Sequence, residues 1–252
     1  MNSRMIRILV CAGLALAFTV STASATPNVS WMQMTPTPFG SAPPFSSTYT
    51  LPGVGTVQMT YTGPLSDFTE ARLQAPLMQN GFVGPYSWTS QEALARTNWA
   101  YSGTLNSPWQ VTYTFSSTIP GGTLILGVQG LGRRDPLPGE NPLDCISTAS
   151  VAQNGTYFGD WTGGGTYGAT LFSGGAGNFT MMNSVSGAGG YDPWWNTGLA
   201  VVRIDDSVSS LTVHFNQTAG DGLGVNIGVL VPEPSAIALL ALGGLASLRR
   251  RR

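Results

Sequence analysis

The chain has 252 residues, of which 9% are charged and 33 are glycine, and its formal net charge is −1. Six of the eleven arginines lie near the two ends, so residues 26–230 carry five arginines, no lysine and eleven acidic residues, a net charge of −6. A negatively charged surface does not attract phosphate backbones, so nucleic-acid partners are disfavoured. The low fraction of charged residues is typical of an exported β protein rather than of a cytosolic enzyme.

The first 25 residues have the pattern of a secretory signal peptide. Two arginines precede an apolar segment at 8–20, and Ala23 and Ala25 form an A-x-A cleavage site, so we predict cleavage after Ala25. Cys11 is removed with this segment. Cys145 is then the single cysteine of the remaining chain, which excludes an internal disulfide, and we expect it to be buried.

The segment after the signal peptide begins with an irregular, Pro-rich and Ser-rich stretch in which one strand is predicted, at 46–51. Apolar and polar residues alternate at 57–62, which predicts a second strand with one buried face. Two short helices are predicted next. Residues 66–79 have the densest helical propensity but are interrupted by Pro76, and residues 90–96 form the other candidate.

Strands dominate the rest of the chain. Every second residue of 109–116 is aromatic or valine, which predicts a half-buried strand, whereas 123–129 is apolar on both faces and predicts a strand covered on both sides. Residues 132–145 predict a long loop with three prolines, and 155–190 predict short strands joined by glycine turns. The last predicted strands are 199–204, 211–216 and 223–229, of which the final two should pair as an antiparallel hairpin.

Many short strands with turn signals between them, little helix and no alternation of strands with helices indicate an all-β fold. We predict a single antiparallel β-sandwich, jelly-roll-like, at residues 26–230. A signal-peptide helix at 1–25 and a short hydrophobic helix within 231–252 should flank it.

The C-terminal segment has three parts in a fixed order. Pro232, Glu233 and Pro234 come first, an uncharged run at 235–248 follows, and the chain closes with Arg249, Arg250, Arg251 and Arg252. As a helix the run would span about 21 Å, which is short for a hydrocarbon core of about 30 Å. The arginines should stay on the cytoplasmic side of the membrane, with the bulk of the chain outside.

This arrangement resembles the PEP-CTERM sorting signal of Gram-negative bacteria. The resemblance implies recognition by exosortase, a membrane protease-transpeptidase, after a transient tether to the cytoplasmic membrane, and delivery to the cell surface or the extracellular space. A GPI signal is disfavoured, because it needs a polar spacer and lacks terminal arginines. A plain C-terminal membrane anchor is the remaining alternative.

Few residues suggest chemistry within the predicted sandwich. His214 is the only histidine and should point to the polar face of its strand, no G-x-S-x-G motif is present, and zinc would need more His or Cys ligands, so we predict no catalytic residues. Asp205, Asp206 and Asp221 are candidate ligands for Ca²⁺, although aspartate is equally typical of tight turns. No other cofactor is expected.

Trp194 and Trp195 are adjacent in a predicted loop, beside Asp192 and Asn196. Exposed aromatic rings with polar neighbours can stack on sugar rings, while core packing is the more usual role of tryptophan. The sequence therefore predicts a non-enzymatic structural or adhesive protein of the cell surface or extracellular matrix. The alternative is a carbohydrate-binding module that acts on extracellular polysaccharide.

Overall fold

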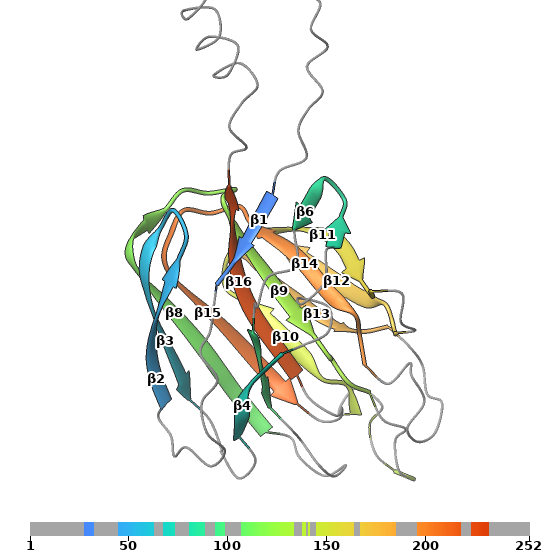
Figure 1. Cartoon of the computed structure of the whole chain (residues 1–252). Helices are drawn as coiled ribbons and strands as arrows, with labels where there is room; N and C mark the ends of the chain where they lie inside the picture. The colour runs from blue at the N-terminus through green and yellow to red at the C-terminus, as the bar shows by residue number, and fades with distance from the viewer. Residues whose placement is uncertain are drawn as a thin grey trace, which may run out of the picture.

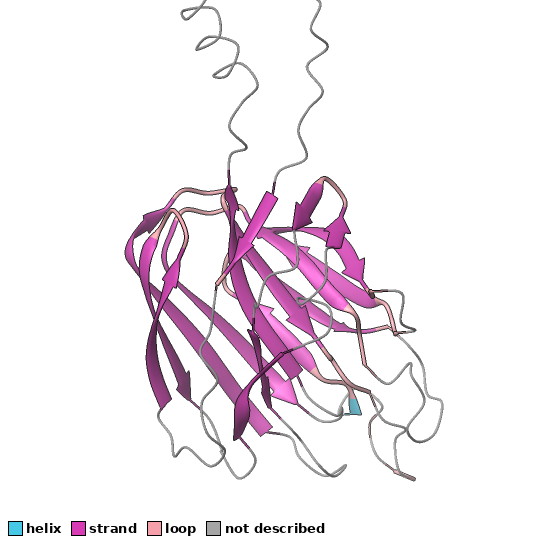
Figure 2. Ribbon diagram, in the orientation of Figure 1, coloured by secondary structure: helices cyan, strands magenta, loops and turns pink. Residues whose placement is uncertain are grey.

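The computed structural model describes residues 28–32, 45–62, 68–73, 81–88, 94–98, 107–133, 138–139, 141, 145–163, 167–184, 196–217 and 223–231. These residues form two sheets that pack face to face, and strands make up most of the described chain (Figures 1 and 2). The predicted all-β sandwich is confirmed. Both predicted flanking helices lie outside the described residues.

The first sheet has nine strands. Seven of them follow one another across the sheet in the order β11 (Gly155–Trp161), β14 (Leu199–Ile204), β9 (Leu124–Gln129), β16 (Leu223–Val231), β1 (Asn28–Trp31), β6 (Tyr86–Trp88) and β5 (Gly81–Val83). The other two form a branch in which β16 pairs with β7 (Leu94–Asn98), and β7 pairs with β4 (Phe68–Leu73). These neighbours are antiparallel except β1 and β6.

The second sheet has seven strands, all antiparallel to their neighbours. Their order is β12 (Thr170–Gly175), β13 (Asn178–Asn183), β10 (Thr148–Val151), β15 (Val208–Gln217), β8 (Ser107–Ile119), β3 (Gly55–Thr62) and β2 (Phe45–Leu51). From β8 to β16 the chain changes sheets at every connection except that between β12 and β13. Such repeated crossing is the connectivity on which jelly rolls are built.

The main core lies between the two sheets and follows the predicted alternation. On β8 the side chains of Trp109, Val111 and Tyr113 are buried, and the ring of Trp109 stacks on Phe215 of β15 with centroids 4.0 Å apart. β9 is buried along its whole length, as its two apolar faces predicted. Its inner side chains join this core, whereas Ile125 points to the opposite face of the first sheet.

A second core covers that opposite face. The β5–β6 hairpin reaches β11, the other edge strand of the first sheet, so this part of the sheet curls around its own side chains. Trp31 and Trp88 meet edge to face with ring centroids 5.8 Å apart, and Trp88 meets Trp161 in the same way at 5.6 Å. A Cβ atom at Gly228 would lie 2.7 Å from Val29, so only glycine leaves room for this layer on β16.

Three predictions about elements are wrong. Neither predicted helix forms within the described residues, because β4 and β7 pair with each other there and β7 also pairs with β16; pairing of this kind overrides local helical propensity. The last two strands are no hairpin, since β15 belongs to the second sheet and β16 to the first. β1 was not predicted, because a four-residue strand leaves too short a pattern in a Pro-rich segment.

The two ends of the sandwich differ in their connections. At the end where β1 begins and β16 finishes, here called the exit end, the connections have two to four residues: 52–54, 84–85, 120–123, 152–154, 176–177 and 205–207. At the opposite end, called the far end, the connections have five to eighteen residues: 63–67, 99–106, 130–147, 162–169, 184–198 and 218–222.

Candidate functional site

The last strand of the sandwich leads directly into the C-terminal segment. Val231 ends β16 and pairs with Asn28, the first residue of β1, so the two strand ends lie side by side at the exit end (Figure 1). Leu230 is also fastened on its other side, where its N–H donates to the carbonyl oxygen of Thr123 at 3.0 Å. Pro232 follows Val231 in the chain, so no linker separates the sheet from the Pro-Glu-Pro motif.

Because β16 passes directly into the C-terminal segment, the protein is a folded body with a directly attached C-terminal tail. Residues 230–252 match the family model of the PEP-CTERM protein-sorting motif. The chain therefore carries a PEP-CTERM motif, which marks it as an exported protein whose membrane-anchored precursor is processed by exosortase. No match was found among curated proteins or among solved structures.

The predicted sorting residues fall inside the matched segment. Pro232, Glu233, Pro234 and the arginines from Arg249 to Arg252 all lie within 230–252. They lie outside the described residues, as do Ala23 and Ala25 of the predicted signal cleavage site. In the part of the chain that the structure describes, no helix is long and apolar enough to span a membrane.

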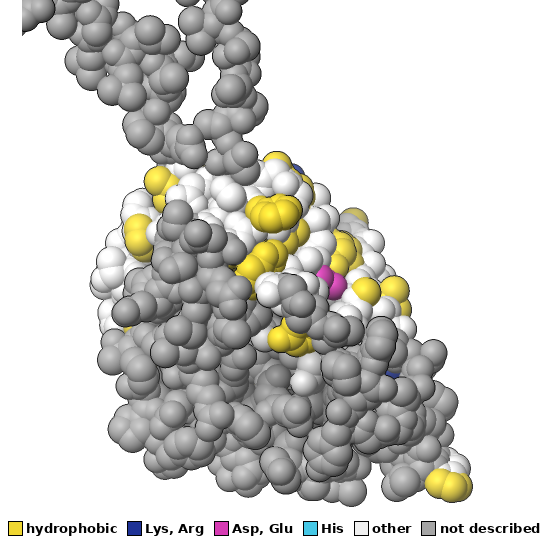
Figure 3. Space-filling model, turned by 45° about the vertical axis from the view of Figure 1, so that its right-hand side comes forward, with side chains coloured by type: hydrophobic (Ala, Val, Ile, Leu, Met, Phe, Trp, Pro, Cys, Tyr) yellow, Lys and Arg dark blue, Asp and Glu magenta, His cyan; other side chains and the backbone are white. Residues whose placement is uncertain are grey.

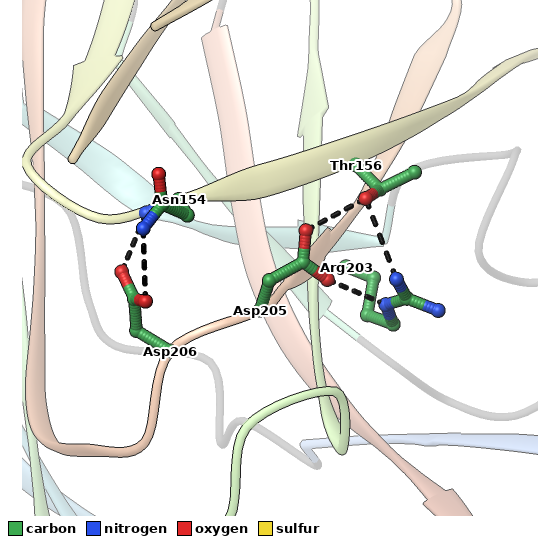
Figure 4. A network of polar contacts seen from close by, with 5 residues as sticks. All are labelled: Asn154, Thr156, Arg203, Asp205 and Asp206. Carbon is green, nitrogen blue, oxygen red and sulfur yellow. Dashed lines mark hydrogen bonds and ion pairs between the residues drawn. The ribbon is translucent and has the colours of Figure 1, made fainter. Parts of the chain in front are cut away.

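A polar network joins two of the short turns at the exit end (Figure 4). Asp206, in the β14–β15 turn, accepts hydrogen bonds from the backbone N–H of Asn154 at 2.6 Å and from its side-chain amide at 3.0 Å. Asp205 accepts from Nε of Arg203 at 2.7 Å and from the hydroxyl of Thr156 at 2.6 Å. The two carboxylates therefore tie the β14–β15 turn to the β10–β11 turn and to the start of β11.

The charges of this network follow from its hydrogen bonds. The Asn154 side chain and then its backbone N–H donate to the Asp206 carboxylate and lower its pKa, against a smaller opposing effect of burial. The pKa of Arg203 is raised, chiefly by its hydrogen bond to Asp205. Because both partners of the Arg203–Asp205 ion pair keep about a third of their surface exposed, the pair contributes at most about 1 kcal/mol.

A third turn, the β8–β9 connection at 120–123, is hydrogen-bonded to the β14–β15 turn. The N–H of Gly121 donates to the hydroxyl oxygen of Ser207 at 3.0 Å, and the N–H of Gly122 donates to the carbonyl oxygen of Ile204 at 2.8 Å. The backbone of Gly121 lies so close to Asp205 that a Cβ atom would collide with the Asp205 carbonyl oxygen. The exit end is thus closed by direct contacts between turns.

The predicted calcium ligands are placed as follows. Asp205 and Asp206 lie in one turn, but their carboxylates accept hydrogen bonds from four protein donors, with which a Ca²⁺ ion would compete. Asp221 lies outside the described residues, in the connection that leaves β15 at the far end. Among the described residues, no group of three or more His, Cys, Asp or Glu side chains is gathered for a metal.

The other predicted residues are spread over the molecule. Trp194 and Trp195 lie outside the described residues, in a connection that leaves β13 at Asn183 and enters β14 at Leu199, both at the far end. His214 is exposed on the polar face of β15, as predicted. Cys145 is fully buried, also as predicted.

One polar contact that closes the sandwich was not predicted. A β-bulge in β11 between Tyr157 and Gly159 brings Tyr157 and Asp160 to the same face, although residues three apart in a regular strand point to opposite faces. Asp160 accepts a hydrogen bond from the N–H of Thr170 on β12 at 2.6 Å, which links the edges of the two sheets. Burial, followed by the nearby Asp160 charge, raises the pKa of Tyr157. In the sequence, Gly159 is the residue that could have indicated this bulge, since a glycine within a strand often marks one. Its φ of 123° is an angle that other residues rarely adopt.

Proposed function

We propose that the chain is a non-enzymatic structural or adhesive protein of the cell surface or extracellular matrix, which is held by its exit end and presents its far end outward. The observation that carries this proposal is the direct passage from β16 into the PEP-CTERM motif. The acidic side chains of the exit end support it as well, because they bond neighbouring turns together.

The position of β16 suits a protein that is held by its tail. β16 pairs with β9 along residues 224–229, and its other edge pairs with β7 and then with β1. A pull along the tail would load these hydrogen bonds together in shear, rather than one after another as at a free edge. A tail on a strand inside the sheet therefore couples the attachment point to the whole first sheet.

Mass spectrometry of the intact protein from the cell surface and the medium tests the sorting. We expect a mature chain that begins at Thr26 and lacks the arginines 249–252. The double variant Pro232→Ala/Pro234→Ala is the matched control, because it should accumulate as a precursor that keeps those arginines. An unmodified wild-type chain with both ends intact would contradict the proposal.

The non-enzymatic part of the proposal has its own test. The purified protein should release no sugars from a broad panel of polysaccharides. Turnover that disappears when a single carboxylate is changed to its amide would show a hydrolase instead, since glycoside hydrolysis depends on paired acids.

A carbohydrate-binding role is the second candidate function. It is favoured by the place of the connection that carries Trp194 and Trp195, which begins and ends at the far end, opposite the attached tail. On a glycan array, replacing both tryptophans by alanine should weaken binding about tenfold or more, equivalent to about 1.4 kcal/mol. Binding that survives this double substitution would remove the candidate.

A further inference from the structure

A row of four residues crosses the exit end of the first sheet. Val231 of β16 pairs with Asn28 of β1, Asn28 pairs with Ser87 of β6, and Ser87 pairs with Phe82 of β5. We call these four residues the exit row. Paired residues project to the same face of a sheet, so all four side chains point away from the second core, into which Val29 projects from the next position of β1.

The exit row is uncharged, and its two outer members are apolar and exposed, whereas Asn28 and Ser87 between them are polar and half-buried. Phe82 is 74% exposed and Val231 is 38% exposed, and both rank among the three large hydrophobic side chains exposed in the described chain. Figure 3 shows hydrophobic side chains exposed in the upper half of the molecule, the half nearest the ends of β1 and β16. A phenylalanine held this far out on a short hairpin has no role in either core.

The length of the tail places the exit row close to the membrane. The uncharged run begins at residue 235, four residues after Val231, and four extended residues reach at most about 14 Å. The headgroup layer adds roughly 5–8 Å on each side of the hydrocarbon core. While the run is in the bilayer, the exit row is therefore held close to the lipid headgroups.

We propose that the exit row is a membrane-contact surface of the tethered precursor, with the ring of Phe82 inserted among the lipid headgroups. The inference rests on the membrane-anchored precursor that the sorting motif implies. Aromatic rings are favoured at the membrane–water interface. Among the described residues at this end, the acids Asp205 and Asp206 already accept hydrogen bonds from protein donors, which lowers the cost of bringing them near the lipid.

The contact holds the body in one orientation. One flexible point of attachment would leave the sandwich free to tilt, whereas the tail and Phe82 provide two points on the same sheet, on β16 and on β5, with β1 and β6 between them. The far end, with its long connections, is then directed away from the bilayer. The segment that exosortase recognises begins where β16 leaves this contact.

The test places a fluorophore that responds to polarity at residue 82. The full-length Phe82→Cys chain carries the label in a Cys11→Ser background, where the remaining native thiol, Cys145, is buried. It is reconstituted into vesicles of phosphatidylethanolamine and phosphatidylglycerol. The matched control is Leu171→Cys, because Leu171 is 53% exposed and lies on β12, an edge strand of the second sheet.

We expect the label at residue 82 to shift to shorter wavelength, to gain at least twofold in emission, and to be quenched by lipids brominated near the headgroup. The label at residue 171 should show none of these three changes. Vesicle flotation separates the two levels of the argument. Failure to float would contradict the anchored precursor itself, whereas flotation with water-like emission at residue 82 would overturn only the proposed contact.

A second variant distinguishes lipid from the processing enzyme. With the label at residue 87 (Ser87→Cys), Phe82→Ser should reduce the quenching by brominated lipids severalfold in the absence of any other protein, while Leu171→Ser should not. If Phe82→Ser instead slows removal of the tail in cells and leaves this quenching unchanged, the exit row binds exosortase and our proposal is wrong.

Discussion

The exit end and the far end of this sandwich differ in the length and the bonding of their connections. At the exit end, turns of two to four residues are bonded to one another through Asp205, Asp206 and Ser207. At the far end, connections of up to eighteen residues join the same strands. The sorting tail therefore departs from the end whose turns are short and bonded to one another.

The largest expected effect comes from emptying the second core beneath the exit end. Trp31 is fully buried, and its ring lies over the glycines 127 and 228. Trp31→Ala should lower the free energy of unfolding by about 3–5 kcal/mol, measured by urea unfolding followed by circular dichroism. Phe82→Ala is the control, which should change it by less than about 0.5 kcal/mol because that ring is exposed. If Trp31→Ala lowered the free energy of unfolding by as little as Phe82→Ala does, the second core would add no stability.

A pair of glycine substitutions compares the two ends directly. Gly121→Ala places a Cβ against the Asp205 carbonyl oxygen at the exit end and should cost about 1–3 kcal/mol. Gly139→Ala at the far end meets no atom within 4 Å and carries only the strain of its φ of 89°, roughly 1 kcal/mol. Thermal unfolding of both variants checks the order. A larger loss for Gly139→Ala would contradict the view that the exit end is the tightly closed one.

The charge of Asp206 gives a smaller effect that depends on pH. Its pKa is lowered in the folded state, so it adds stability above its unfolded pKa of about 3.9, and this stability is lost as the pH falls through the folded pKa. Asp206→Asn should therefore be less stable than the wild type at pH 7, and the difference should shrink below about pH 4. Urea unfolding across this range measures it.

Ser207→Ala is the matched control for Asp206→Asn. It removes a hydrogen bond from the same turn, the one that Gly121 donates, but no titratable group. Its loss of stability should stay constant between pH 3 and pH 7. A constant difference for Asp206→Asn as well would mean that the charge of Asp206 plays no part in holding the turn.

The smallest expected effect is at His214. This side chain is exposed on β15, so His214→Gln should change the free energy of unfolding by less than about 0.5 kcal/mol. Recovery of the mature protein from the cell surface should also stay unchanged. A large loss in either measurement would assign His214 a role that its place on the polar face of the second sheet does not suggest.

Local patterns predicted much of this molecule. The alternation at 109–116 predicted the buried face of β8, and the two apolar faces at 123–129 predicted the buried strand β9. The same patterns failed at β4, β7 and the last two strands, where pairing with distant segments overrode helical propensity and a crossing replaced a hairpin. Period-two alternation describes a strand but does not say which sheet it joins.

The candidate sites divide in the same way. Pro232, Glu233 and Pro234 were recognisable because a sorting signal is a linear motif made of consecutive residues. The bonds of Asp205 and Asp206 to Asn154 and Thr156 were not, because their partners are about fifty residues away in the chain. Likewise the Tyr157–Asp160 pair depends on a bulge that only a neighbouring strand defines.

The sequence by itself determined that the chain is exported and rich in strands, because a sorting motif and an alternating pattern are properties of neighbouring residues. Only the tertiary structure decided that the start of β1 lies beside the end of β16, and that the first sheet has a core on each face. It also decided that Phe82 lies in one row with Val231. These features arise from contacts between segments about two hundred residues apart, and no local pattern encodes which of many possible pairings has the lowest free energy.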